Sequence, residues 1–558
     1  MRVLIVGGYG VFGERLARLL LRDGHRVWVA GRDLAAAERL AAEIGCEAVR
    51  FDRGGGLAGL AGFEVVVDAA GPFHAYGADP YRLARAAIAA GVHYLDFSDN
   101  AGFCTGIVAL DAVAKAAGVC VISGLSSVPA LSSAAVVALA GPDPVRVIDV
   151  AILPGNRAPR GLSVMASILA QAGQPMPVWR GRQWDRMRGW SDLVKYDLPG
   201  GVARQGWRIM VPDALLFPAA FGAESVRFSA GLELGVMRYG LAGFAAVQRV
   251  LNLRVGRGLV RLFKAAADLL APFGTGQGGM VVKVVAGGQV RVWRLLAAAG
   301  DGPCIPAIPA RALLRRTALP VGARPAVGVI TLAEAEAAIG DLRVRTERLA
   351  VAFTPIFPRV LGPGFHDLPA EIRATHDTAD CSRWQGMAQV DRGRGLWPGL
   401  LAVLFGMPPA AKDVAVTVTK QVTPQGETWV RQFGRHRFRS DLAATPQGMT
   451  ERFGPFTFLL GLWVADGALH YPVKAARIGP MPLPQRLLPR VEAREFGQDG
   501  RFRFDVALFA PVSGGLIVRY RGWLQPAAPG DPSRPFGANG FRVQQPAPSG
   551  LGQRGPEP

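Results

Sequence analysis

The chain has 558 residues, more than the ~250–300 residues that one hydrophobic core usually holds, so we expect two or three domains. Half of the residues are hydrophobic, yet no stretch approaches the ~18 consecutive apolar residues of a membrane-spanning helix. The net charge of +20 does not indicate a nucleic-acid partner, because the excess is diffuse arginine outside the first 140 residues and no basic run is interleaved with aromatic residues.

The amino end and the cysteines exclude two further classes of protein. The first residues, MRVLIVGG, run directly into a glycine turn and lack the apolar core and cleavage site of a signal peptide, so we expect a cytoplasmic protein. Five scattered cysteines without a C-x-x-C pair indicate neither a disulfide framework nor a zinc site. No HExxH motif is present either, so we expect no bound metal.

The first 135 residues alternate strands with helices. We expect strands over 2–6, 26–30, 47–51, 64–69, 93–97 and 119–122, and helices over 12–21, 34–44, 80–90 and 110–117. The strand over 64–69 is apolar almost throughout, as in a parallel sheet that is buried on both faces. The alternation predicts an α/β fold, with a doubly wound parallel sheet of the Rossmann type over residues 1–135.

Residues 136–325 change in pattern and are predicted to form a second domain of the α/β (α+β) class. They include a tryptophan-rich stretch over 179–207 and a basic amphipathic stretch over 241–270. Apolar residues over 305–314, within the segment 301–316, predict a helix that returns to pack on the first domain. Residues 320–325 have the Pro/Gly composition of a linker.

Beyond residue 353 the sequence is rich in strands. Residues 414–422 alternate valine and threonine, and we expect further strands over 428–433, 456–464, 501–508 and 516–523. A β-rich C-terminal domain is therefore predicted over 353–525. Residues 526–558 are predicted to be disordered, because their proline and glycine content leaves little apolar surface to bury.

A glycine-rich turn follows the first strand and opens the first helix. Three glycines at this spacing allow a tight turn, a close approach of the backbone to a pyrophosphate and close helix–strand packing. Free N–H groups at the start of the helix stabilise phosphate charge. The turn therefore predicts a dinucleotide site, the alternative being a Rossmann-like sheet with an empty turn. Its residues are Gly8, Tyr9, Gly10, Val11, Phe12 and Gly13.

The end of the second strand indicates which nucleotide binds. NAD-binding domains usually place Asp or Glu there, on the ribose 2′-hydroxyl, whereas this sequence has Arg32, which suits a 2′-phosphate. The next residue, Asp33, either turns toward the ribose or caps the following helix. Asp52, after the third strand, is either an acceptor for the adenine amino group or a solvated loop acid. We predict NADP(H) as the cofactor, in preference to NAD.

Other candidate residues follow later strands, at the carboxyl edge where ligands bind in open α/β folds. Gly71 and Pro72 follow the fourth strand and are expected beside the nicotinamide ribose. Asp96 is either a catalytic residue or a structural hydrogen-bond acceptor, and Ser126 either binds substrate or caps a helix. No Tyr-x-x-x-Lys pair follows this core, so any hydride chemistry would belong to the cofactor.

Four phrases, GGYGVFG, AAGPFHAYG, GVHYLDFSD and GLSSVPALS, resemble the NADP-binding domain of the saccharopine dehydrogenase-like reductases over residues 1 to about 135. The resemblance implies a Rossmann domain followed by a second α/β domain that closes over the substrate. Where that family commonly has Gly-Glu, this sequence has Ser98-Asp99, so amino-acid recognition is not carried over. The cofactor contacts that the resemblance implies are Gly8, Gly10, Gly13, Arg32, Gly71 and Pro72.

Residues 357–524 resemble an uncharacterised domain that is often fused behind such reductases in bacteria, through phrases such as RVLGPGFHDLPAEIRATH and GETWVRQFGRHRFRS. This resemblance implies no activity. A set of polar residues in the region either lines a pocket or forms a solvated face, and a β-rich domain with aromatic inner positions is able to hold an apolar ligand. The set is His376, Arg431, Arg435, His436, Arg437, Arg439 and Glu451.

Two functional hypotheses follow. The first is an NADPH-dependent oxidoreductase that reduces a carbonyl, imine or enoyl group of a small-molecule substrate, which the Trp- and Met-containing stretch near 176–187 suggests is apolar. The second is a non-catalytic NADP(H)-binding scaffold or sensor whose C-terminal half binds a partner or a membrane. Peripheral membrane contact through residues 241–270 is the less favoured alternative to core packing with a basic outer face. The sequence indicates no oligomeric state.

Overall fold

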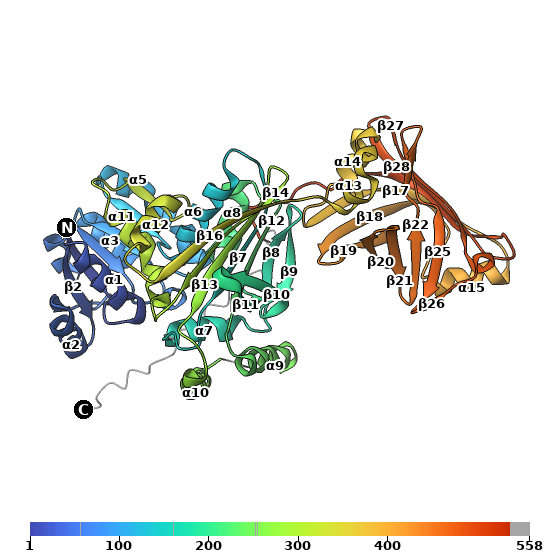
Figure 1. The fold of residues 1–558 in the computed structure, drawn as a ribbon. Coiled ribbons are helices and arrows are strands. Elements are labelled where there is room, and N and C mark those ends of the chain that lie inside the picture. The colour runs from blue at the N-terminus through green and yellow to red at the C-terminus, as the bar shows by residue number, and fades with distance from the viewer. Residues whose placement is uncertain (56, 160, 252, 254, 536–558) are drawn as a thin grey trace, which may run out of the picture. The chain divides into compact units, whose positions relative to one another are not determined.

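The computed structural model describes residues 1–535 except 56, 160, 252 and 254. The chain forms two compact units, shown in Figure 1. The first contains Met1–Trp179, Trp184–Val351 and residues 531–535, and the second contains Arg180–Gln183 and Ala352–Gly530. Within the tail predicted to be disordered, residues 536–558 lie outside the described residues.

The first sheet is the predicted doubly wound parallel sheet. Its seven strands lie in the order β15-β6-β5-β4-β1-β2-β3, and every pair is parallel. The order β3-β2-β1-β4-β5-β6 is that of a Rossmann fold, so this prediction is confirmed. The strands are β1 (Arg2–Val6), β2 (Arg26–Gly31), β3 (Glu47–Arg50), β4 (Val65–Asp68), β5 (His93–Asp96), β6 (Cys120–Ser123) and β15 (Gly322–Pro325).

Several helices of this part of the chain are amphipathic, whereas α6 and α11 are buried on nearly all sides. In α1 the side chains of Leu16, Leu19 and Leu20 are buried at helical spacing, as the sequence indicates. The helices are α1 (Val11–Arg22), α2 (Leu34–Ile44), α3 (Arg82–Ala89), α4 (Ala101–Gly106), α5 (Asp111–Ala116), α6 (Ser132–Ala140), α11 (Ile308–Leu314) and α12 (Leu332–Ile339), and a short helical turn, η4 (Ser127–Leu131), precedes α6.

The linker predicted over residues 320–325 is wrong. These residues contain β15, which pairs in parallel with β6 and forms the edge of the first sheet. An edge strand needs one hydrogen-bonded neighbour only, and therefore tolerates Pro325 at its end. The partner strand lies about 200 residues earlier in the chain, which is why local composition did not reveal the pairing.

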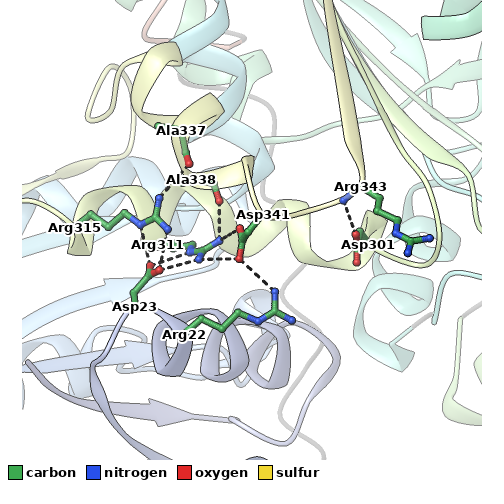
Figure 2. Close-up of polar contacts among 9 residues, drawn as sticks. All are labelled: Arg22, Asp23, Asp301, Arg311, Arg315, Ala337, Ala338, Asp341 and Arg343. Atoms are coloured by element: carbon green, nitrogen blue, oxygen red, sulfur yellow. Dashed lines mark hydrogen bonds and ion pairs between the residues drawn. The ribbon is translucent and has the colours of Figure 1, made fainter.

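The segment before β15 lies against the first helix. Arg311, in α11, donates two hydrogen bonds to Asp23, the C-cap of α1, and two more to Asp341, which follows α12 (Figure 2). Its guanidinium also donates to the carbonyl of Ala338, at 2.8 Å. Arg315 reaches Asp23 as well. A buried arginine thus joins α1, α11 and the residues after α12.

A second, mixed sheet completes the first unit. Seven of its nine strands lie in the order β10-β11-β12-β7-β13-β14-β16, and β8 connects β9 to β12. One continuous apolar core includes Leu20 of α1, Val136 of α6 and Trp293 of β14, so the two sheets share it. The strands are β7 (Val145–Leu153), β8 (Pro175–Arg180), β9 (Gln183–Arg188), β10 (Ser191–Leu198), β11 (Val202–Arg208), β12 (Ser225–Gly231), β13 (Gly278–Ala286), β14 (Gln289–Ala297) and β16 (Val344–Ala352). The helices are α7 (Leu162–Gln171), α8 (Pro212–Phe221), α9 (Gly235–Leu251) and α10 (Arg257–Leu269).

The second unit is built on one antiparallel sheet of 13 strands, so the predicted β-rich character is confirmed. Along each strand one face carries the aromatic and aliphatic residues of a separate core. The strands are β17 (Cys381–Arg392), β18 (Ala411–Thr423), β19 (Gly426–Phe433), β20 (His436–Thr445), β21 (Gly448–Phe453), β22 (Phe456–Leu460), β23 (Trp463–Ala465), β24 (Ala468–His470), β25 (Val473–Ile478), β26 (Met481–Pro482), β27 (Arg490–Gln498), β28 (Arg501–Phe509) and β29 (Leu516–Pro526). The helices are α13 (Ile356–Leu361), α14 (Ala370–His376) and α15 (Leu396–Leu404).

Candidate functional site

The glycine-rich turn joins β1 to α1 and is fixed against the neighbouring strand. The amides of Gly7 and Gly8 donate to the carbonyl of Ala30, at 2.8 and 3.2 Å. Gly10 donates to Gly7 and is the N-cap of α1. The N–H groups of the first helical turn, which include those of Val11 and Phe12, lie too early in the helix to have a partner within it. They are donors of the kind that bind a phosphate group.

Two glycines of the turn have no room for a side chain. A Cβ on Gly13 would lie 2.8 Å from the Cα of Gly8, and a Cβ on Gly8 would lie 2.8 Å from the carbonyl oxygen of Ile5. Real Cβ atoms essentially never approach other atoms that closely. The start of α1 therefore lies directly on the turn because residue 13 is glycine.

Tyr9 covers the end of the second strand. Its ring occupies the space in which a side chain of Gly31 would lie. Its hydroxyl accepts a hydrogen bond from the amide of Asp33, at 3.3 Å. The carboxylate of Asp33 accepts from the amide of Ala36 and caps α2, which settles the alternative left open by the sequence. Arg32, between Gly31 and Asp33 in the chain, is exposed.

Asp52 and its neighbour Arg53 have different surroundings. Asp52 is exposed, and its carboxylate accepts a hydrogen bond from the amide of Gly54, at 3.0 Å, so it stabilises a local turn. The guanidinium of Arg53 lies 3.1 Å from the ring centroid of Tyr76, and its Nε lies 3.3 Å from Oδ2 of the buried Asp68. The sequence did not identify Arg53 as a candidate, because Asp68 and Tyr76, which it contacts, lie at or beyond the end of a different strand.

Asp68 organises the loop that carries Gly71 and Pro72. Its Oδ1 accepts from the amide of Ala70, at 3.1 Å, and from the hydroxyl of Tyr76, at 3.1 Å. Burial raises the pKa of Asp68, while Arg53 opposes that rise. Gly71 and Pro72 therefore occupy a loop that is held at the carboxyl end of β4, beside the glycine turn that follows β1.

Asp96 lies at the carboxyl end of β5 and is fully buried. Its Oδ1 accepts hydrogen bonds from the amides of Ser98 and Gly124 and from the hydroxyl of Ser123. Burial raises its pKa to about 7. These contacts join the loops after β5 and β6, which is the structural alternative from the sequence. A catalytic role for Asp96 stays a prediction.

Ser126 begins the helical turn η4 and is partly exposed. Its side chain makes no capping hydrogen bond, so the capping alternative does not hold. A role in substrate binding stays a prediction.

Helix α8, from the part of the chain that forms the second sheet, packs on α4 and on η4. It therefore covers the carboxyl edge of the first sheet. Asp213, in its first turn, is fully buried, and neither carboxylate oxygen has a hydrogen-bond partner among the described residues. Burial raises its pKa to about 8, against the partial effect of the nearby Ser132. Besides Asp96, this part of the unit thus holds a second buried carboxyl group, brought by a helix that lies more than 100 residues further along the chain.

In the second unit the predicted polar set divides into two groups. Arg431, Glu451 and His376 point into the unit, where Arg431 Nη2 lies 3.1 Å from Glu451 Oε1 and His376 is fully buried. His436, which is half-buried, donates through Nε2 to the carbonyl of Gly406, at 2.7 Å. The remaining members are exposed: Arg435, Arg437 and Arg439.

Helices α9 and α10 carry an outward apolar face on the first unit. In α9 the exposed side chains recur on one face, opposite the buried Leu241 and Ala245. Only a few residues of α9 and α10 are buried in the core of the unit. The exposed apolar residues of the two helices, which we call the helix-pair face, are Val236, Tyr239, Val247, Val250, Leu251, Leu262 and Leu269.

No group of three or more histidine, cysteine, aspartate or glutamate side chains suited to a metal ion occurs among the described residues. No helix in the described part of the chain is long and apolar enough to cross a membrane.

Two family comparisons match separate parts of the chain. Residues 3–122 match the saccharopine dehydrogenase NADP binding domain, which confirms the resemblance of the N-terminal part and supports a nicotinamide cofactor and oxidoreductase chemistry in general. Residues 368–524 match a domain of unknown function, DUF4166. No curated protein matches the chain.

Solved structures similar to the chain include saccharopine dehydrogenase (L-Glu forming) from Saccharomyces cerevisiae, at 12% identity and a TM-score of 0.43, covering 62% of this chain and 99% of that one. A dehydrogenase (MviM) from Clostridium difficile has 9% identity and a TM-score of 0.26, covering 54% and 80%. AtPrR2 with NADP+ and (+)pinoresinol has 26% identity and a TM-score of 0.15, covering 17% of this chain and 35% of that one.

Proposed function

We propose that the first unit is an NADPH-dependent oxidoreductase that reduces a carbonyl, imine or enoyl group of an apolar small molecule. The observation that carries the proposal is the end of β2, where Arg32 is exposed and the carboxylate of Asp33 caps α2. An arginine at this position suits a ribose 2′-phosphate, whereas NAD-binding domains usually have Asp or Glu there.

The residues around this point would divide the binding of the cofactor among them. The amides at the start of α1 would bind the pyrophosphate, and the ring of Tyr9 with Arg32 would bind the phosphorylated ribose. The loop of Gly71 and Pro72, held by Asp68, would position the nicotinamide end. NADPH, when bound, supplies the hydride. The chain then has to orient the substrate and exclude water, and the cover that α8 forms over this edge supports both roles.

The proposal is tested by titrating the full chain with NADPH and NADH and following the fluorescence of the reduced nicotinamide. Arg32→Ala is expected to weaken NADPH binding at least tenfold and NADH binding less than twofold, because only NADPH has the phosphate that Arg32 would bind. Arg39→Ala, an exposed arginine of α2, is the matched control. Equal weakening of both nucleotides by Arg32→Ala would refute the choice of NADPH.

Turnover separates the oxidoreductase from the alternative hypothesis. NADPH oxidation with medium-chain aldehydes and 2-enals is expected to be faster than with short ones. Tight NADPH binding with no oxidation by any of them would favour the non-catalytic scaffold or sensor, and absence of NADPH binding would refute both.

The helix-pair face supports a second proposal, that this part of the first unit lies on an anionic membrane surface. Val250 and Leu269 are 82% and 76% exposed, which is unusual for large apolar side chains, and exposed cations lie on the same helices at Arg249, Arg257 and Arg261. An apolar face flanked by basic residues is typical of helices that lie at a bilayer interface.

Co-sedimentation with vesicles tests the membrane proposal. We expect binding to phosphatidylglycerol-containing vesicles and little binding to vesicles of phosphatidylcholine alone. The double substitution Val250→Asp and Leu269→Asp is expected to lower the bound fraction at least fivefold, because it places two charges in the apolar face. Val113→Asp, at another exposed apolar side chain of the first unit, is the control. Absence of sedimentation with the unsubstituted protein would end this proposal.

A further inference from the structure

The sheet of the second unit encloses an apolar cavity. The inward side chains of strands far apart in the sheet order, such as Val418 of β18, Phe458 of β22 and Phe504 of β28, line the same space. Residues at alternate positions line it, including Val491, Ala493 and Glu495 on β27, as expected for one face of a strand. The cavity has a volume of about 140 Å³ and is lined mainly by apolar side chains, so it suits an apolar ligand.

One ion pair of the cavity lining is already complete. Arg431 Nη2 lies 3.1 Å from Glu451 Oε1, and Nη1 donates to the hydroxyl of Ser440 at 2.7 Å. That hydroxyl donates to the same carboxylate oxygen, at 2.6 Å. The guanidinium also lies 4.8 Å from the ring centroid of Trp429. Arg431 is therefore held by the protein and is not a spare cation.

A second buried network of hydrogen bonds surrounds Lys420, the other cation of the lining. Lys420 Nζ donates to the carbonyl of Thr375 at 2.7 Å and lies 3.3 Å from His376 Nδ1. His376 Nε2 lies 2.5 Å from Glu495 Oε2, which also accepts from the hydroxyl of Tyr471 at 2.6 Å. Burial lowers the pKa of His376 to about 4, so the imidazole is neutral and connects the amine to the carboxylate.

The interior is consequently balanced in charge. The inner cations, Lys420 and Arg431, are matched by the carboxylates of Glu495 and Glu451, and a third buried carboxyl group, Glu427, interacts with Lys420, while Arg494 is exposed to solvent. An anionic ligand such as a fatty acid would bring a carboxylate without a counter-ion, and an unpaired buried charge is costly. An uncharged ligand avoids this cost.

One hydrogen-bond donor faces the cavity without a protein partner. Tyr520 lines the cavity, its ring lies against Phe433 and Phe504, and its hydroxyl makes no hydrogen bond to another described residue. Burial raises the pKa of this phenol to about 12, so it remains a donor at neutral pH. A polar group inside an apolar cavity normally has a partner, and a ligand oxygen would satisfy it.

We propose that the cavity of the second unit binds an uncharged lipid-like molecule, with a long apolar body and one hydroxyl or carbonyl oxygen that accepts a hydrogen bond from Tyr520. The apolar lining removes the body of the ligand from water, and the hydroxyl of Tyr520 fixes the position of its oxygen. The two compensated ion pairs select against charged head groups. The proposal does not depend on the oxidoreductase proposed for the first unit.

The test uses the full chain without nucleotide and the neutral dye Nile red, whose fluorescence rises in apolar surroundings. Dodecan-1-ol is expected to displace the dye at a concentration at least tenfold lower than dodecanoate at pH 7.5. Val491→Trp, which fills the cavity, is expected to reduce dye binding at least tenfold. Glu492→Trp, next along β27 and exposed, is the matched control and is expected to bind normally.

Tyr520→Phe removes the donor without changing the shape of the lining. It is expected to weaken dodecan-1-ol about fivefold, the size of one neutral hydrogen bond, and to leave dye binding unchanged. Stronger displacement by dodecanoate than by dodecan-1-ol would overturn the uncharged class of ligand. Equal dye binding by the two tryptophan variants would overturn the cavity as its site, and an unchanged affinity of Tyr520→Phe for dodecan-1-ol would overturn the role of the hydroxyl.

Discussion

Replacing Gly13 with valine is expected to abolish binding of NADPH, with an affinity at least 50-fold lower than that of the unsubstituted protein. Even the first carbon of the new side chain would lie 2.8 Å from the Cα of Gly8, and the contact is with backbone that has no rotamer to change. The start of α1 would have to move away from the turn. The N–H groups of that helical turn would then point away from the pyrophosphate they are proposed to bind.

Nicotinamide fluorescence and isothermal titration measure this loss. Gly59→Val is the control. Gly59 belongs to the same unit, and a Cβ there would have no atom within 4 Å. Circular dichroism of both variants shows whether the fold is kept. A folded Gly13→Val protein that binds NADPH normally would contradict the proposed site at this turn.

Replacing Arg311 with alanine is expected to lower the free energy of unfolding of the first unit by roughly 3–5 kcal/mol, the usual cost of removing one partner from a buried ion pair. The side chain is 2% exposed and makes paired hydrogen bonds to Asp23, each at 2.8 Å (Figure 2). It also donates to Asp341. Without it, Asp23 retains Arg315 and Asp341 retains Arg22, but both carboxylates lose their buried partner and the carbonyl of Ala338 loses this donor.

The effect of Arg311 depends on pH with a definite sign. Burial alone would raise the pKa of Asp23, but hydrogen bonds from Arg311 and Arg315 outweigh it and hold that pKa well below its usual range. A depressed pKa contributes stability above about pH 4, the ordinary range of Asp, and this contribution is lost as the pH falls toward the folded-state value. The difference between Arg311→Ala and the unsubstituted protein should therefore shrink in acid.

Urea unfolding at pH 7 and at pH 3, followed by circular dichroism, measures both effects. Arg315→Ala is the matched control, since Arg315 contacts the same Asp23 but is 37% exposed, and we expect it to cost about 1 kcal/mol or less. A pH-independent loss, or equal losses for the two variants, would show that burial of the Arg311 pair does not determine the stability.

Much of the first sheet was predictable because its signals are local. The strand over 2–6 was placed at the bounds of β1, and the second strand within one residue of β2, since an unbroken apolar run ends in each case at a glycine. The spacing of the glycines likewise placed the turn between β1 and α1. The region over 320–325 was misread, because nothing in its Pro/Gly composition shows that β6 offers it an open edge.

The side chains near the candidate sites were less predictable than the backbone around them. The sequence left Asp33 between two roles, and only the position of α2 showed that it caps the helix. The sequence identified Arg431 and Glu451 as polar candidates. It did not identify Lys420, Glu495 and Tyr520, which lie on other strands, or Tyr471, which follows β24. Such residues have no distinguishing neighbours along the chain.

The sequence by itself determined the Rossmann sheet, the glycine turn and the β-rich character of the second unit, because periodic burial and turn chemistry act between residues close in the chain. Only the tertiary structure decided that β15 completes the first sheet, that Arg311 joins α11 to α1, and that the interior of the second unit is balanced in charge. These features depend on contacts between residues separated by tens to hundreds of positions. Burial then decides which polar groups must be paired, and no local pattern records that requirement.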